Sequence, residues 1–287
     1  MNRPQVRLLI AVLAIGSILI FSGCIDRDGE GASPRRAATV AVAGSTTVMP
    51  LVEACAEEWN MIQDEVRVTV TGGGSGVGIK NVAEGMADIA MASRDVKPEE
   101  IVAYGDRFVE FLVAYDAIAV VVSQGIYDAG VTDLSQEELK AIYAGEVANW
   151  KDLGGPDERI YAVAREVGSG TRDTFNGMVM GSVEAETPGV TTYHGSNAEV
   201  KTAVTRSNRA IGYVGMNYAE GGTLRAVAYQ GVAPSEESIK DGSYPLSRAL
   251  HLYTFGDPGP DAEKFIDFVL SDQGQDIVAE SGFVPAG

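Results

Sequence analysis

Residues 66–86, VRVTVTGGGSGVGIKNVAEGM, decide the fold class of this 287-residue chain. The segment 66–70 alternates apolar and polar residues, which predicts a half-buried strand. The glycine-rich turn 72–76 follows, and we expect a helix from Val77 to about Met86. A strand, a tight turn and a helix in succession are the elements of an α/β unit.

The same order of elements recurs along the chain and predicts an α/β fold with a largely parallel sheet. The run at 108–123, FVEFLVAYDAIAVVVS, is too long for one ordinary strand, so we expect it to pass from one domain to the next. Residues 221–244 are polar and are expected to be irregular. The other expected strands are 39–43, 87–93, 160–165, 210–215 and 248–256, and the other expected helices are 49–62, 98–105, 134–145, 172–180, 196–206 and 261–280.

The chain is acidic, with 40 Asp and Glu residues against 22 Lys and Arg residues and a formal net charge of −18. This charge argues against nucleic acid as a partner, because nucleic-acid binding depends on basic groups that neutralise phosphates. It also repels small anions at long range, so an anion site in this chain has to be built locally from aimed donors.

The amino-terminal segment has the features of an export signal. Basic residues precede a short apolar run at 8–21, and small residues and Cys24 follow it. The sequence FSGC, which ends at Cys24, resembles a lipoprotein cleavage box. We therefore expect residues 1–24 to be a lipoprotein signal peptide, Cys24 to carry the lipid and residues 25–37 to form a flexible tether. Cys55, the other cysteine, then has no disulfide partner and is expected to be a buried small hydrophobe.

Three turns share one design, in which a strand ends, a Gly/Ser/Thr turn follows and a helix begins. The first turn of a helix leaves backbone N–H groups unpaired. Glycine lets the backbone come close to a ligand, and the hydroxyl groups of Ser and Thr add hydrogen-bond donors. Such turns suit an oxyanion, although each one alone is also an ordinary helix cap. Arg165 precedes the third turn, and its planar guanidinium offers several N–H donors that suit an oxyanion. Its alternative role is a surface ion pair. The turns are GSTT at 44–47, GGGSG at 72–76 and GSGTR at 168–172.

Motifs for other kinds of site are missing from the sequence. The glycine turn has neither the lysine of a nucleotide P-loop nor the spacing of a dinucleotide fingerprint, and Ser75 is not in a G-x-S-x-G elbow. The two histidines, His194 and His251, lie far apart without a Cys/His cluster, so we predict no metal site and no cofactor. A Ser–His–Asp triad stays open as an alternative, but no serine stands out as a nucleophile, and we predict no catalytic residue.

Several blocks taken together are similar to the substrate-binding protein of phosphate ABC importers, and the resemblance covers about residues 39–285. It implies an α/β, two-lobed periplasmic-binding-protein fold of type II, in which each lobe is a mixed, mostly parallel sheet flanked by helices and the lobes close over the anion. Residues 38–115 with 246–287 would form lobe 1, and residues 116–245 would form lobe 2. The blocks are GSTTVMPLVE (44–53), TGGGSGVGIKN (71–81), ADIAMASRDVK (87–97), LSQEELKAIYAGEVANWKDLGG (134–155), REVGSGTRDTF (165–175) and QDIVAESGFVP (275–285).

The resemblance also implies which residues bind phosphate. One lobe supplies short loops with hydroxyl side chains, and the other supplies an R-x-x-x-S-G-T pattern. The matching positions are Ser45 and Thr46 in the first loop, Ser75 in the second, Ser93 in the third, and Arg165, Ser169, Gly170 and Thr171 in the pattern of the other lobe.

One position departs from the family pattern. Some members have Asp directly after the third-loop serine, and this carboxylate accepts the proton of hydrogen phosphate and repels unprotonated sulfate. This chain has Arg94 there, followed by Asp95. We expect Asp116 to accept the phosphate proton instead; its alternative role is that of a hinge residue whose carboxylate is bonded to the backbone. We expect Asp95 to face solvent or to cap a turn. Arg94 either points at the anion or braces its loop.

We therefore expect a monomeric, lipid-anchored protein on the extracytoplasmic face of the cell membrane. It would close on inorganic phosphate and deliver it to the membrane subunits of an ABC permease, without making or breaking a bond. The first alternative is a binding protein for another oxyanion, namely sulfate, molybdate or tungstate. The second is an extracellular hydrolase with Ser75 or Ser169 as nucleophile, and the third is a sensory or adhesive protein with the same fold.

Overall fold

A computed structural model describes residues 37–219 and 224–287 of the chain. The predicted signal peptide, Cys24 and all but the last residue of the predicted tether lie outside the described residues. Within the described ranges, no helix has both the length and the apolar character that a membrane crossing needs.

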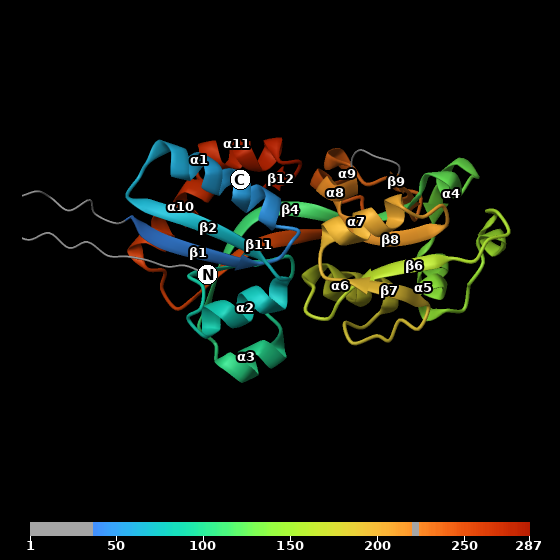
Figure 1. The fold of residues 1–287 in the computed structure, drawn as a ribbon, viewed down its shortest axis with the longest axis horizontal. Coiled ribbons are helices and arrows are strands. Elements are labelled where there is room, and N and C mark those ends of the chain that lie inside the picture. Colours follow the sequence, from blue (N-terminus) through green and yellow to red (C-terminus); the bar gives the residue numbers. More distant parts are fainter. Residues whose placement is uncertain (1–36, 220–223) are drawn as a thin grey trace, which may run out of the picture. The chain divides into compact units, whose positions relative to one another are not determined.

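The long strand β4 (Phe108–Ser123) runs through the middle of a ten-stranded sheet (Figure 1). Its residues 108–117 pair with β11, and its residues 118–122 pair with β8, so one strand serves two halves of the sheet. The strand order is β2-β1-β3-β11-β4-β8-β6-β7, with β9 and β12 also paired to β4, and β5 and β10 form a separate pair. The other strands are β1 (Ala38–Gly44), β2 (Val66–Gly72), β3 (Ile89–Ala92), β5 (Asp133–Leu134), β6 (Tyr161–Arg165), β7 (Val190–His194), β8 (Ala210–Gly215), β9 (Leu224–Ala226), β10 (Ala228–Tyr229), β11 (Ser247–Phe255) and β12 (Val284–Pro285).

We call the part of the sheet with β1, β2, β3, β11 and β12 the β1 half, and the part with β6, β7, β8 and β9 the β6 half. Parallel pairing joins β1 to β2 and β3 in one half, and β6 to β7 and β8 in the other. All pairings of β4 and β11 are antiparallel, so the sheet is mixed, with less parallel pairing than the sequence suggested. The reason is topological, because these two strands carry the chain between the halves in opposite directions.

Helices cover both faces of each half (Figure 1). In the β1 half, α1, α10 and α11 pack on one face and α2 packs on the other. In the β6 half, α7 packs on one face, and α5 and α6 pack on the other. The helices are α1 (Met49–Ile62), α2 (Ser75–Ala83), α3 (Pro98–Tyr104), α4 (Gln124–Asp128), α5 (Gln136–Ala144), the 3-10 turn η1 (Trp150–Leu153), α6 (Gly170–Phe175), the π-helical turn η2 (Asn176–Met180), α7 (Asn197–Thr205), α8 (Met216–Ala219), α9 (Glu236–Lys240), α10 (Pro260–Leu270) and α11 (Asp272–Glu280).

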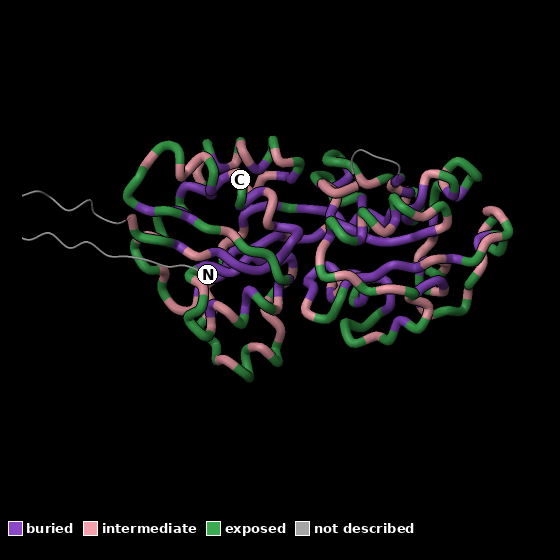
Figure 2. The backbone as a smooth tube through the Cα atoms, in the orientation of Figure 1, coloured by how far each residue is buried: buried purple, intermediate pink, exposed green. Residues whose placement is uncertain are grey.

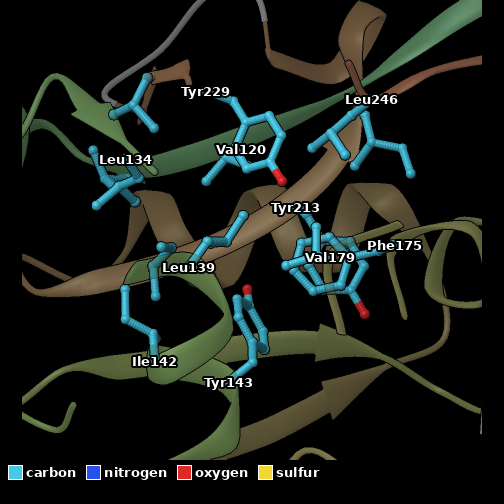
Figure 3. Close-up of a cluster of buried hydrophobic side chains, with 14 of the residues drawn as sticks. Val120, Leu134, Leu139, Ile142, Tyr143, Phe175, Val179, Tyr213, Tyr229 and Leu246 are labelled. Carbon is cyan, nitrogen blue, oxygen red and sulfur yellow. The ribbon is translucent and has the colours of Figure 1, made fainter. Parts of the chain in front are cut away.

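Buried strands form the interior of both halves (Figure 2). In the core of the β6 half, the rings of Phe175 and Tyr213 stack with centroids 4.0 Å apart, and Tyr143 meets Phe175 edge-on at 4.8 Å (Figure 3). Such aromatic pairs contribute about 0.5–1.5 kcal/mol beyond burial. Because Phe175 is the last residue of α6, this packing holds the turn at 168–172 in place.

Several segments differ from the sequence prediction, and three of them bear on the site or on the region predicted to be irregular. Helix α2 begins at Ser75, two residues earlier than expected, because Gly74 has a φ of 93° and ends the extended segment there. Strand β7 was not expected, since its residues VTTYH are largely polar and show no clear apolar alternation. Within 224–244, where irregular chain was predicted, β9, β10 and the short helix α9 are present, and Ser235 caps α9.

Candidate anion-binding site

The hydroxyl residues predicted in the β1 half lie together at the carboxyl ends of its parallel strands. Ser45 follows β1, Ser75 opens α2 after β2, and Ser93 follows β3. Ser45 Oγ donates to Ser93 Oγ at 3.1 Å, and Ser75 Oγ lies 3.4 Å from Ser93 Oγ. All three side chains are buried. The turns meet because parallel strands end at the same edge of a sheet, the usual position of ligand sites in α/β folds.

The turn before α6 brings the predicted residues of the β6 half against this cluster. The Gly76 N–H donates to the Gly168 carbonyl at 3.0 Å, and the hydroxyls of Thr47 and Thr171 are 2.9 Å apart. A Cβ at residue 170 would overlap Ser75 Oγ, so this close approach requires the glycine that the sequence has there.

Arg165 lies at the end of β6 and is 1% exposed. Its Nε donates to the His194 carbonyl at 3.2 Å, and its Nη2 donates to the Gly195 carbonyl at 2.7 Å and to Thr46 Oγ1 at 3.2 Å. Among the described residues Nη1 has no hydrogen-bond acceptor, so two N–H groups remain for a ligand. Burial lowers the pKa of Arg165 to about 10, which leaves the guanidinium charged at neutral pH.

A second guanidinium, that of Arg248 on β11, belongs to the same cluster and was not predicted. Its Nη1 donates to Thr171 Oγ1 at 3.0 Å, and its Nη2 donates to Thr47 Oγ1 at 3.3 Å. Asp116 Oδ2 accepts from its Nε at 3.1 Å and its Nη2 at 2.8 Å. Arg248 and Asp116 stand directly opposite each other on the two crossing strands, a pairing that becomes visible only once the strand register is known.

The charges of this cluster favour an anion. Arg165, Arg248 and Asp116 are all buried, which places two positive charges beside one negative charge. Hydroxyl groups and the unused N–H groups of Arg165 surround them, and electrostatic attraction is stronger in such a buried site than in water. The site is therefore locally positive in a chain of net charge −18, as the sequence argument required.

Comparison with known proteins identifies the family. The PBP superfamily domain matches residues 29–273. The phosphate-binding protein PstS of Bacillus subtilis is 31% identical over 289 residues, which cover 97% of this chain and 94% of that protein. This chain belongs to the phosphate-binding protein family.

Solved structures confirm the predicted two-lobed fold of the phosphate-binding proteins. A putative phosphate ABC transporter substrate-binding protein from Clostridium perfringens, solved with bound phosphate, has a TM-score of 0.80 and 36% identity, covering 87% of this chain and all of that one. An ABC-type phosphate transport receptor from Vibrio cholerae has a TM-score of 0.70 and 32% identity, covering 85% of this chain and 99% of that one.

The side chain of Arg94, one of the residues predicted to bind phosphate, is engaged by carboxylates in this member of the family. Arg94 Nε donates to Asp173 Oδ2 at 2.8 Å, and its terminal nitrogens donate to Glu100 at 2.8 Å. Of its two alternatives, the structure shows Arg94 bracing its loop, and its role as an anion ligand stays a prediction. Ser169 Oγ accepts from the Arg172 N–H at 3.3 Å and caps α6.

The carboxylate of Asp116 lies in the cluster, but it already has partners. Besides the bonds of Oδ2 with Arg248, Oδ1 accepts from the Met216 N–H at 3.1 Å. Burial raises the pKa of Asp116, and Arg248 opposes this rise. In this structure Asp116 is the counter-ion of Arg248, and its role as acceptor of a phosphate proton stays a prediction. Asp95, in contrast, is exposed to solvent, one of the two positions expected for it.

Asn197 is a further site residue that the sequence reasoning missed. Its Nδ2 donates to Thr46 Oγ1 at 3.2 Å and to Thr47 Oγ1 at 2.9 Å, while its Oδ1 accepts from the Gly215 N–H at 3.2 Å. It opens α7 directly after β7, in a fourth turn of the strand–turn–helix design. The Gly-Ser-Asn sequence at 195–197 was the available signal, but it was overlooked because β7 was not recognised.

Proposed function

We propose that this protein captures inorganic phosphate outside the cytoplasmic membrane and delivers it to the membrane subunits of an ABC permease. The observation that carries the proposal is the buried set of hydroxyl groups and guanidinium groups, to which both halves of the sheet contribute. The names of the relatives support phosphate as the ligand, since the curated relatives are phosphate-binding proteins and the Clostridium perfringens structure holds phosphate.

Direct hydrogen bonds would hold the anion. Charge-assisted bonds of this kind contribute about 1.5–3 kcal/mol each. Arg248 and Asn197 would orient the threonine hydroxyls, and Arg165 would supply the unused donors of Nη1. The proposed ligands are Ser45, Thr46, Ser75 and Ser93 from the β1 half, and Arg165, Ser169, Gly170 and Thr171 from the β6 half.

Binding and release would require the two lobes to close and open. We assign residues 38–115 with 246–287 to one lobe and residues 116–245 to the other, with the bend in β4 and at the start of β11. Opening would break the bonds that join the lobes, such as Gly76 to Gly168 and Arg94 to Asp173. A permease could then distinguish the loaded from the empty protein by shape.

The protein would act by binding alone and not as an enzyme. In the hydrolase alternative, Ser75 or Ser169 needs a base beside its hydroxyl. Within the described residues, the hydroxyl of Ser75 contacts Ser93 and that of Ser169 contacts the Arg172 N–H, and neither contacts a histidine. The arrangement therefore gives no support to a nucleophilic serine.

The protein would work as a monomer held at the membrane surface by a lipid on Cys24. The FSGC sequence and the apolar run before it support this anchor. The polar residues 25–37 would form a flexible tether between the lipid anchor and the folded domain.

Calorimetric titration tests which anion the protein binds and how strongly it prefers phosphate. The full-length protein, purified in detergent and freed of phosphate, would be titrated calorimetrically with phosphate, sulfate and molybdate on both sides of the second pKa of phosphate. We expect tight binding of phosphate alone, and equal binding of sulfate would refute the proposal. Asp116→Asn should lower the preference for phosphate over sulfate, whereas the exposed control Asp267→Asn should not. An unchanged preference in Asp116→Asn would remove Asp116 from the acceptor role.

A further inference from the structure

A second cluster of polar side chains lies on the β1 half, outside the anion site. It consists of His251 on β11, Glu110 on β4 and Asp95 in the loop after β3. His251 Nδ1 is 2.8 Å from Glu110 Oε1, and His251 Nε2 is 3.5 Å from Asp95 Oδ1. One nitrogen or oxygen atom from each residue lies within 4.8 Å of those of the other two.

The strand register explains why these three residues meet. Strand β11 lies between β3 and β4, and His251 stands opposite Ala92 on one side and Leu112 on the other. Glu110 is two residues from Leu112, so it points to the same face of the sheet, and its side chain reaches His251 diagonally. Asp95 follows Ala92 by three residues and comes in from the adjoining loop.

Two buried polar atoms at this cluster, one in His251 and one in the neighbouring Tyr253, form no hydrogen bond of acceptable geometry with any residue that the structure describes. His251 is 4% exposed, and although Glu110 is near, its Nδ1 forms no hydrogen bond of acceptable geometry. The hydroxyl of Tyr253, whose ring centroid is 5.5 Å from that of His251, is also buried without a hydrogen bond. Most buried polar groups in proteins have a partner, so an unpaired imidazole nitrogen beside two carboxylates indicates that a ligand belongs there.

The charges of the cluster point to a cation. Among the residues that the structure describes, neither Asp95 nor Glu110 forms an ion pair with lysine or arginine. The nearby Arg94 is already paired with Glu100 and Asp173. The side chain of Asp95 is 89% exposed and that of Glu110 is 52% exposed, so a dissolved ion can reach the cluster and both carboxylates can adjust to it.

We propose that Asp95, Glu110 and His251 bind a divalent transition-metal ion of the zinc type, with water completing its coordination. One imidazole nitrogen and two carboxylate oxygens are common ligands of zinc, and three protein ligands plus water form an open, four-coordinate site. The sequence predicted no metal site because its two histidines are far apart. A mixed site assembled from three separate segments has no spacing signature that a sequence can reveal.

The ion would fasten the loop after β3 to the two central strands of the sheet. That loop begins with Ser93 and Arg94, the residues that contact the anion cluster and the β6 half. Metal binding would thus stabilise the folded protein on the phosphate side of the β1 half, and the gain would appear as a higher melting temperature.

Zinc titration of the full-length protein tests this site. The protein, purified in detergent and treated with a chelator, would be titrated with zinc chloride in phosphate-free buffer by calorimetry, with cobalt(II) absorption as a second readout. We expect one bound ion per chain and a rise in melting temperature. Asp95→Asn and Glu110→Gln should each weaken zinc binding at least about tenfold while the protein stays folded, because both side chains are exposed or half-exposed. His251→Gln should abolish it.

Two control variants separate this site from others on the surface. His194→Gln removes the other histidine, and Asp106→Asn removes an exposed carboxylate from the loop before β4. Both should bind zinc like the unaltered protein. The proposal fails if the unaltered protein takes up no zinc at micromolar concentrations, if Asp95→Asn and Glu110→Gln bind as it does, or if the loss follows His194 instead.

Discussion

The replacement of Arg165 by methionine tests the anion site most directly. Methionine keeps much of the buried volume of Arg165 and removes its charge and all its donors. In the structure Nε and Nη2 of Arg165 donate hydrogen bonds to the carbonyls of His194 and Gly195 and to the hydroxyl of Thr46. With respect to the described residues, the N–H groups of Nη1 remain free to bind the anion. The variant therefore removes both the proposed contact with phosphate and part of the scaffold around it.

The expected magnitude follows from these bonds. Two charge-assisted hydrogen bonds from Nη1 contribute about 3–6 kcal/mol to binding, at about 1.5–3 kcal/mol each. At about 1.4 kcal/mol for each factor of ten, the dissociation constant for phosphate should rise about a hundredfold to ten-thousandfold. The two backbone carbonyls left without Arg165 should in addition cost about 1–3 kcal/mol of folding stability each.

Calorimetric titration with phosphate measures the first effect, and thermal unfolding followed by circular dichroism measures the second. Arg206→Met is the matched control, because it removes the same charge from an exposed position at the end of α7. This control should bind phosphate almost normally, since exposed charges are screened by salt. If Arg165→Met is folded and its affinity falls less than about threefold, within the scatter of a single surface contact, the assignment of Arg165 to the site is refuted.

One further prediction concerns the close approach of the two lobes, and another concerns the two cysteines. Gly170→Ala places a methyl group against Ser75 Oγ and should weaken phosphate binding at least about tenfold by obstructing closure. The control Gly177→Ala should bind phosphate normally, because its added Cβ meets its nearest neighbour at 3.7 Å. Normal affinity in Gly170→Ala would show that the closed contact is dispensable. Burial raises the pKa of the Cys55 thiol to about 12, so an alkylating reagent should label no thiol in the native protein and one after unfolding. A second thiol after unfolding would show that Cys24 carries no lipid, and a single thiol that reacts in the native state as well would show that Cys55 is accessible.

The turns of the anion site were predictable because each one is a local signal. A strand, a short Gly/Ser/Thr turn and a helix lie within about a dozen residues, and the propensities of those residues act at that range. Ser45, Ser75 and Gly170 were therefore placed in the right turns before any contact was known. Arg248 and Asn197 were missed because their contribution depends on partners far away in the sequence, Asp116 for the first and Thr47 for the second.

The sequence alone determined the alternation of strands and helices, the long strand at 108–123 and the local chemistry of the oxyanion turns. The tertiary structure decided which turns meet and which side chains face the space between them. Arg94 illustrates the division, because its charge is evident in the sequence, while its direction depends on Glu100 and on Asp173 in the other half. The cluster of Asp95, Glu110 and His251 likewise exists only through the register of β3, β4 and β11. Propensity and periodicity act between neighbours along the chain, whereas a site depends on residues that only folding brings together.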